Sequence, residues 1–230
     1  MNKILVVAAH PDDEILGCGG TIAKLVKQKK AIAQALIVAE GLTSREKKNI
    51  KIDRKYFDKL YSAAKKSARI IGYSSLEILD FPDNRLDTVP MLKIVQILEK
   101  KISKFKPNLI FTHFNGDLNI DHEIVSNAVL TATRPIKKQS VKKILAFETL
   151  SSTEWSFGRK RKKAFNPNYF ENISNFINVK KKALKAYSLE MRKFPHPRSI
   201  KAVDALAKIR GSTCGHNFAE AFEIVRDIKD

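Results

Sequence analysis

Short apolar runs alternate with charged, amphipathic segments through the first 150 residues, and this alternation restricts the fold more than any other feature of the sequence. The apolar runs predict strands at residues 3–9, 31–39, 76–81, 108–113 and 144–149. The segments between them predict helices at residues 21–29, 45–71, 89–105 and 121–133. Continuous apolar strands are typical of parallel sheets that are buried on both faces. The sequence therefore predicts an α/β protein with a Rossmann-like, doubly wound, mostly parallel sheet and helices on both faces.

The last third of the chain has a less regular pattern. Residues 151–171 are basic and are expected to be irregular, helices are expected at 179–193 and 199–210, and a late strand at 221–228. Neither an internal repeat nor a Gly/Ser-rich linker divides the sequence. We therefore expect one domain that spans residues 1–230.

Polar and titratable residues follow three of the predicted strands. In open α/β sheets, ligands bind beyond the carboxyl ends of the strands, so these positions are candidates for a site. They are His10, Asp12 and Asp13 after the first strand; Asp83, Asn84, Arg85 and Asp87 after the third; and His113, Asp117, Asn119, Asp121 and His122 after the fourth.

The glycines after the first strand do not form a dinucleotide loop. A G-x-G-x-x-G motif that starts at Gly17 requires glycine at position 22, where the chain has Ile22. The acids at positions 12 to 14 would also repel a pyrophosphate. This opening segment is better explained by a cation than by a nucleotide cofactor.

A metal site accounts for the acids at the end of the first strand. Two histidines and one carboxylate, with open positions left over, are typical of a catalytic zinc or iron(II) centre. His10 and Asp13 lie three residues apart, and His122 at the start of a later helix is the natural third ligand. Asp12 would then be free to act as a base towards water. The alternative is a turn whose acids cap the following helix, with Asp121 as a second N-cap.

The sequence also resembles a known family. AHPDDE at residues 9–14, with Asp-His at 121–122 opening a helix, is similar to the PIG-L/LmbE-like zinc-dependent N-acetylglucosaminyl deacetylases. Further similar segments extend the resemblance over nearly the whole chain. They are FPDNRLD at 81–87, NGDLNIDH at 115–122, TATRP at 131–135, PHPRS at 195–199 and AEAFE at 219–223.

The resemblance implies one Zn²⁺ ion per chain, with other divalent metals as alternatives. It implies metal ligands at His10, Asp13 and His122 and a general base at Asp12, in agreement with the residue pattern. The implied reaction is removal of an acetyl group from an N-acetylated amino sugar carried on a nucleotide, lipid or glycoconjugate. Asn119 and Asp121 join Asp12 as catalytic candidates.

One position departs from the family pattern. Many relatives have H-x-D-H where this chain has Asn119-Ile-Asp-His122, and an amide can donate a hydrogen bond but cannot deliver a proton. The general acid is therefore either Asp12 itself or another histidine. The candidates for such an imidazole are His113, His196 and His216.

Several residues are candidates for binding the substrate. Arginine suits bidentate phosphate recognition and acids suit sugar hydroxyls. Trp155 is either a packing residue or a sugar platform. The predicted substrate-binding residues are Asp83, Arg85, Arg134, His113, His196 and His216.

Composition bounds the location and the partners. The net charge is +19, and lysine supplies most of the basic residues, which a general lysine bias explains in large part. The functional interpretation is a substrate with an anionic carrier group. The basic run at 159–163 is either a solvated loop or a nucleic-acid patch, and nucleic acid is the disfavoured partner.

Two cysteines without paired spacing fit a reducing compartment, and the longest apolar run is too short for a membrane span. We therefore expect a cytoplasmic protein of undetermined oligomeric state.

Two alternatives stay open. The same ligands could serve a metal-dependent esterase or phosphoesterase. A different class is a basic nucleic-acid-binding protein with a vestigial metal motif.

Overall fold

The computed structural model describes residues 1–45, 54–157 and 164–229. The basic run at 159–163 lies outside the described residues. Within them, one sheet is formed by β1 (Asn2–Ala8), β2 (Ala31–Ala39), β3 (Ser75–Phe81), β4 (Leu109–His113), β5 (Lys143–Phe147), β6 (Tyr169–Asn172) and β7 (Ala219–Asp227). The helices are α1 (Asp13–Lys27), α2 (Arg54–Ile71), α3 (Met91–Phe105), α4 (Ile120–Ala132), α5 (Ile177–Ala186) and α6 (Ile200–Thr213). Short 3₁₀ turns are η1 (Thr43–Arg45), η2 (Leu86–Thr88) and η3 (Thr153–Trp155).

The sheet has the predicted Rossmann-like order. Its strands run β3-β2-β1-β4-β5-β7-β6. The first five are parallel, and β7 pairs antiparallel with both β5 and β6. The chain order reverses between β1 and β4, which is the position where sheets of this type bind ligands. The α/β fold with a mostly parallel sheet is therefore confirmed.

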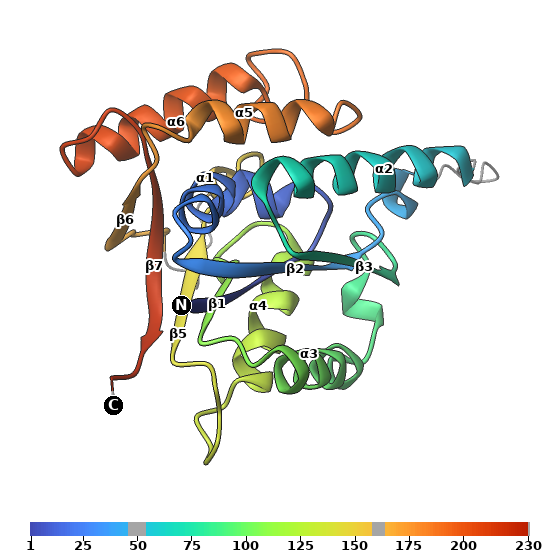
Figure 1. Cartoon of the computed structure of the whole chain (residues 1–230). Coiled ribbons are helices and arrows are strands. Elements are labelled where there is room, and N and C mark those ends of the chain that lie inside the picture. Colours follow the sequence, from blue (N-terminus) through green and yellow to red (C-terminus); the bar gives the residue numbers. More distant parts are fainter. Residues whose placement is uncertain (46–53, 158–163, 230) are drawn as a thin grey trace.

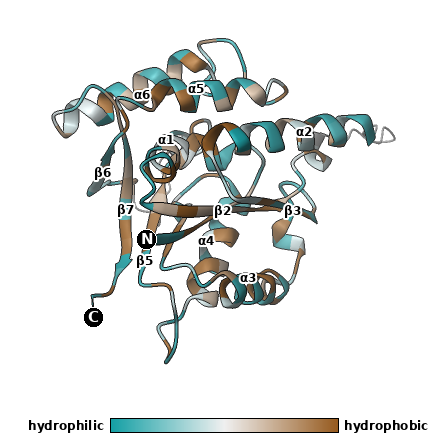
Figure 2. Cartoon of the chain, viewed as in Figure 1, coloured by the Kyte–Doolittle hydropathy of each residue, from teal (hydrophilic) through white to brown (hydrophobic). Residues whose placement is uncertain are grey.

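Helices cover both faces of the sheet, as predicted. α1, α2, α5 and α6 lie on one face and α3 and α4 on the other (Figure 1). Alternate residues of β1 serve the two sides: Ile4 and Val6 pack with the first group, and Leu5 and Val7 with the second. Hydrophilic residues (teal) and hydrophobic residues (brown) alternate along α2 and α3 in Figure 2, as expected for helices that bury one side.

Helix α1 begins eight residues earlier than the sequence predicts. The glycines that follow the first strand lie inside α1. Larger side chains would not fit there, because this helix packs closely against its neighbours. A methyl group on Gly17 would lie 2.2 Å from a ring carbon of Phe147, and one on Gly20 would lie 2.9 Å from Ile173. Close packing therefore overrides the low helix propensity of glycine.

The C-terminal third is more ordered than predicted. β6 was not anticipated, because a four-residue edge strand leaves little signal in the sequence. Helix α5 ends at Ala186 rather than at 193, since the buried Tyr187 turns inward at its end. A loop (orange, top of Figure 1) then joins α5 to α6.

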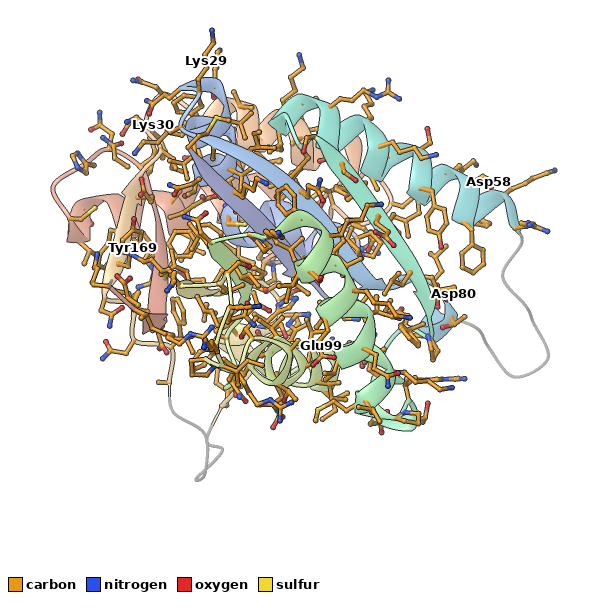
Figure 3. All side chains as sticks on the ribbon, turned by 60° about the horizontal axis from the view of Figure 1, so that its bottom comes forward. Lys29, Lys30, Asp58, Asp80, Glu99 and Tyr169 are labelled. Carbon is orange, nitrogen blue, oxygen red and sulfur yellow. The ribbon has the colours of Figure 1, made fainter. Side chains whose placement is uncertain are left out.

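The exterior carries much of the charge. Lys29 and Lys30 project from the turn after α1, and Asp58 and Glu99 lie on the outer sides of α2 and α3 (Figure 3). Within the described residues, no helix combines the length and the apolar character that crossing a bilayer requires.

Candidate metal centre

The predicted site residues meet where β1 and β4 lie side by side. His10 follows β1 directly, Asp13 opens α1, and His122 lies in the first turn of α4. All three side chains are buried. Asp13 and His122 are 109 residues apart in the sequence, and the parallel pairing of β1 with β4 brings them together.

Three ligand atoms form a nearly equilateral triangle. Asp13 Oδ2 lies 3.2 Å from His10 Nδ1 and 3.2 Å from His122 Nε2, and the two ring nitrogens are 3.3 Å apart. A tetrahedral zinc site with bonds of about 2.0–2.1 Å requires ligand–ligand edges of about 3.3–3.4 Å. The triangle therefore fits one face of such a tetrahedron, and it leaves the fourth position for water or substrate.

The charges around the triangle favour a cation. Burial lowers the pKa of His10, but its hydrogen bonds with Asp121 and Asp13 outweigh this and raise the pKa to about 10. Burial likewise opposes protonation of His122, and the carboxylates of Asp13 and Asp117 nevertheless raise its pKa. Positive charge is thus stabilised at this point of the fold, as a divalent metal requires.

A carboxylate faces the remaining nitrogen of each histidine. His10 Nε2 lies 3.0 Å from Asp121 Oδ2, and His122 Nδ1 lies 3.2 Å from Asp117 Oδ1. Metal-binding histidines usually donate their second N–H to such a group, which fixes the orientation of the ring. Asp121 is held in turn by the backbone N–H groups of Asn84 and Leu86, at 2.7 and 3.0 Å.

A second acidic group shares His10. Asp83 Oδ1 lies 3.1 Å from His10 Nε2, beside Asp121. The oxygens of Asp83 also accept hydrogen bonds from the Ser44 hydroxyl and the Asn84 amide. This second group offers one nitrogen and two carboxylates, whereas the triangle on the other side of His10 offers the two nitrogens and one carboxylate that are typical of catalytic zinc.

Asp12 differs from every other acid of the site. It caps α1 with a φ of 102°, and its own N–H donates to Glu14 Oε2 at 3.0 Å. Its carboxylate is fully buried, and among the described residues neither oxygen has a hydrogen-bond partner. Burial is the main reason that the pKa of Asp12 lies well above its usual range. A buried carboxylate that accepts no hydrogen bond, in a strained backbone conformation, is typical of a functional group.

Arg198 is a site residue that sequence reasoning missed. Its Nη1 lies 3.3 Å from Asp12 Oδ2 and its Nη2 lies 3.4 Å from Asp13 Oδ1. Its Nε donates to Ser151 Oγ at 2.9 Å. The signal in the sequence is PHPRS at 195–199, where Arg198 follows His196 by two residues.

Glu14 and Tyr187 were also missed. The Tyr187 hydroxyl donates to Glu14 Oε1 at 2.6 Å, and both side chains are buried. Burial raises the pKa of Glu14 to about 7. Since the other oxygen of Glu14 accepts the N–H of Asp12, this pair supports the backbone turn that carries the site.

Asn119 caps helix α4 at the edge of the site. Its Oδ1 accepts the N–H of Asp121 at 2.8 Å, and its Nδ2 donates to Asn84 Oδ1 at 2.8 Å. The amide thus links the loop after β3 to the start of α4. It is half-buried, and both of its polar atoms have partners within the protein.

His113 is buried beside the triangle, with its Nε2 3.6 Å from Asp13 Oδ2, but both of its ring nitrogens have other partners. Its Nε2 accepts the N–H of Ala9 at 2.8 Å, and its Nδ1 lies 3.3 Å from Thr149 Oγ1. Its ring stacks on that of His122 at 3.8 Å. Burial holds the pKa of His113 well below its usual range, so the ring is neutral and supports His122.

The other predicted residues lie at different distances from this cluster. His196 accepts the N–H of Arg198 at 3.0 Å, and its ring lies 6.0 Å from that of Trp155, at the edge of the site. Arg85 is exposed and precedes η2. Arg134 is exposed beyond the far end of α4, and His216 is exposed in the turn before β7. The structure does not bring the last two to the metal ligands.

Comparison with known proteins identifies the family to which the chain is similar. Residues 5–133 match the model of the PIG-L family, described as GlcNAc-PI de-N-acetylase. A relative from Escherichia coli, the uncharacterized deacetylase YaiS, is 29% identical over 190 residues, which cover 80% of this chain and 89% of that protein.

Two solved structures share the fold. The N,N′-diacetylchitobiose deacetylase from Pyrococcus horikoshii has a TM-score of 0.77 at 19% identity, over 98% of this chain and 84% of that one. The 4-carboxy-2-hydroxymuconate hydratase GalB from Pseudomonas putida also has a TM-score of 0.77, at 20% identity, over 100% of this chain and 98% of that one. At these identities the likeness concerns the fold alone.

Proposed function

The chain belongs to the PIG-L family of GlcNAc-PI de-N-acetylases, and from this premise we propose that it removes the acetyl group from an N-acetylated amino sugar by metal-dependent hydrolysis. The observation that carries the proposal is the triangle of His10, Asp13 and His122 beside the buried carboxylate of Asp12, which accepts no hydrogen bond from the described residues. These are the two parts that amide hydrolysis needs, a metal to activate water and a base to take its proton.

His10, Asp13 and His122 would hold the metal, which we propose to be one Zn²⁺ ion. Two nitrogens and one carboxylate oxygen are typical of catalytic zinc, and other divalent ions can use the same donors. When bound, zinc lowers the pKa of a coordinated water and polarises a carbonyl oxygen. Asp121 and Asp117 would keep the two imidazole rings in place.

Asp12 is proposed as the general base. A base must lie close to the proton it takes and must have a lone pair that accepts no other hydrogen bond, and the carboxylate of Asp12 meets the second condition within the described residues. Arg198 beside it would keep the carboxylate ionised and oriented before the reaction. General base catalysis of this kind contributes roughly 10²–10⁴-fold to the rate.

Asp12 is also the favoured candidate to return the proton to the departing amine. His113 is neutral, and its Nε2 accepts the N–H of Ala9. His196 lies at the edge of the site, where it accepts the N–H of Arg198, and His216 is exposed beside Asn172. Asn119 would position Asp121 and the loop after β3, because both its amide oxygen and its amide nitrogen form hydrogen bonds there.

Sugar recognition is proposed for the loop that follows β3. Asp83 reaches His10, and Arg85 is exposed two residues later, where it is available to an anionic carrier group. Arg134 and His216 would act only on a part of the substrate far from the reacting amide. The unpaired Cys18 and Cys214 support the proposal of a cytoplasmic location.

Acetate release from a panel of N-acetylated sugars tests the function. The panel contains N-acetylglucosamine, N,N′-diacetylchitobiose, a nucleotide-linked N-acetylhexosamine and a glycolipid with an N-acetylhexosamine head group. We expect acetate and a primary amine in equal amounts from at least one member. Hydrolysis of acetyl or phosphate esters, with every amide left intact, would instead establish the esterase or phosphoesterase alternative. Tight, salt-dependent binding of RNA without hydrolysis would establish the nucleic-acid alternative.

A further inference from the structure

Five exposed apolar side chains gather on the loops at the edge of the metal centre. The loops are residues 114–120, 149–157 and 187–199. We call these side chains the apolar rim: Leu118, Ile120, Trp155, Phe157 and Phe194. Phe157 is 79% exposed and Phe194 is 60% exposed. Of the 13 phenylalanines in the sequence, these two are the exposed ones, and Trp155 is the only tryptophan.

Contacts between the three loops bring the rim together. Asn119 N donates to Ser152 Oγ at 3.3 Å, and Ser156 Oγ donates to the carbonyl of Gly116 at 2.9 Å. On the other side, the Trp155 ring lies 6.0 Å from that of His196, two residues after Phe194. The rim is therefore one surface assembled from distant parts of the sequence.

The same loops hold the metal centre. The Ser152 hydroxyl donates to Asp117, whose carboxylate faces His122. Arg198 connects Ser151 to Asp12. Whatever covers the rim therefore also lies against the entrance to the site.

Positive charge accompanies the apolar groups. The Lys201 ammonium lies 5.8 Å from the centre of the Phe194 ring, and Arg192 and Lys193 are exposed beside it. Of the acids on these loops, Asp117 and Glu190 are buried, and the exposed Glu154 accepts the backbone N–H groups of Ser151 and Ser152.

We propose that the apolar rim docks on the surface of an anionic lipid bilayer. Aromatic side chains favour the boundary between head groups and acyl chains, and neighbouring lysines add attraction to anionic lipids. A second copy of the chain is disfavoured because each carries a net charge of +19. Single-stranded nucleic acid is disfavoured because Leu118 and Ile120 cannot stack on bases.

Docking would present head groups of the membrane to the metal centre. Docking itself requires no catalysis, so the two proposals can fail separately.

Vesicle binding tests the rim, with Trp155 as a built-in reporter. The probes are vesicles of phosphatidylcholine alone and of phosphatidylcholine with phosphatidylglycerol, each with and without acyl chains brominated near the head group. We expect sedimentation with the anionic vesicles, weakened by salt, and quenching of Trp155 fluorescence by the brominated lipids. The double variant Phe157→Ser/Phe194→Ser should bind at least tenfold more weakly. The matched control Ile136→Ser, 70% exposed beyond the far end of α4, should bind like the wild type.

Three results would overturn the docking proposal. One is absence of vesicle binding, whether or not the protein dimerises or binds RNA through the rim. Another is binding that the double variant retains in full. The third is binding without quenching of Trp155. Asp12→Asn should bind vesicles like the wild type, so that loss of hydrolysis alone leaves the docking proposal intact.

Discussion

Two adjacent aspartates differ in their surroundings, although the sequence Asp12-Asp13 gives no sign of it. Asp13 faces both histidines, and they hold its pKa well below its usual range against the effect of burial. The carboxylate of Asp12 faces Arg198 and accepts no hydrogen bond within the described residues. The φ of 102° at Asp12 directs the two side chains to different neighbours.

Asp12→Asn therefore separates catalysis from metal binding. The variant should keep one metal per chain and lose about 10²–10⁴-fold in kcat, because only proton transfer is removed. Metal analysis and acetate release measure the two properties on the same sample. The matched control is Asp87→Asn, at an exposed position within η2, and its metal content and kcat should be unchanged. An Asp12→Asn protein without metal would reverse the roles given to the two aspartates.

Arg198 offers a second prediction for single residues. Arg198→Met should lower kcat about 10- to 100-fold, since it removes the positive charge beside Asp12 and the hydrogen bond to Asp13, and a hydrogen bond to a charged group contributes about 1.5–3 kcal/mol. Arg198→Lys should recover part of the rate because it restores the charge. The neighbouring Arg192→Met should leave the rate on a water-soluble substrate unchanged. Equal rates for Arg198→Met and the wild type would remove Arg198 from the site.

At the scale of elements, helix α1 and its N-cap carry the proposed base and one proposed metal ligand, and the position of this helix depends on close packing. Gly17 lies against the Phe147 ring at the end of β5, and Glu220 of β7 accepts the N–H groups of Gly20 and Thr21. Lys180 of α5 pairs with Glu220 at 2.6 Å. Elements from the C-terminal third thereby fix a helix whose start belongs to the site.

Gly17→Ala measures this packing. Alanine is the better helix former, but its methyl group would overlap the Phe147 ring, and overpacking costs about 1–3 kcal/mol. We expect a lower Tm in thermal unfolding. In the background of Phe147→Leu, which shortens the opposing side chain, the same substitution should cost less. A Gly17→Ala protein with a higher Tm would mean that helix propensity outweighs the contact.

At the scale of the whole molecule, the sequence predicted those candidate site residues that lie at or just beyond the carboxyl ends of the strands. His10, Asp13 and His122 were predictable because the carboxyl ends of parallel strands meet at one edge. Arg198 was not, because it reaches Asp13 across 185 residues from a segment without a regular pattern. The start of α1 was also missed, because its glycines are explained only by the side chains packed against them. Local patterns thus predicted the sheet, whereas contacts from the C-terminal third required the structure.

The central claim is that one metal, held by His10, Asp13 and His122, drives hydrolysis of an N-acetyl amide. The most direct measurement removes the metal with a chelator, returns Zn²⁺ in steps and follows acetate release from the preferred substrate. The wild type should regain activity in proportion to added zinc, up to one equivalent per chain. His122→Ala should stay inactive at that point, since it lacks one of the three ligands. Full activity in the metal-free wild type, or recovery in His122→Ala that matches the wild type, would contradict the account.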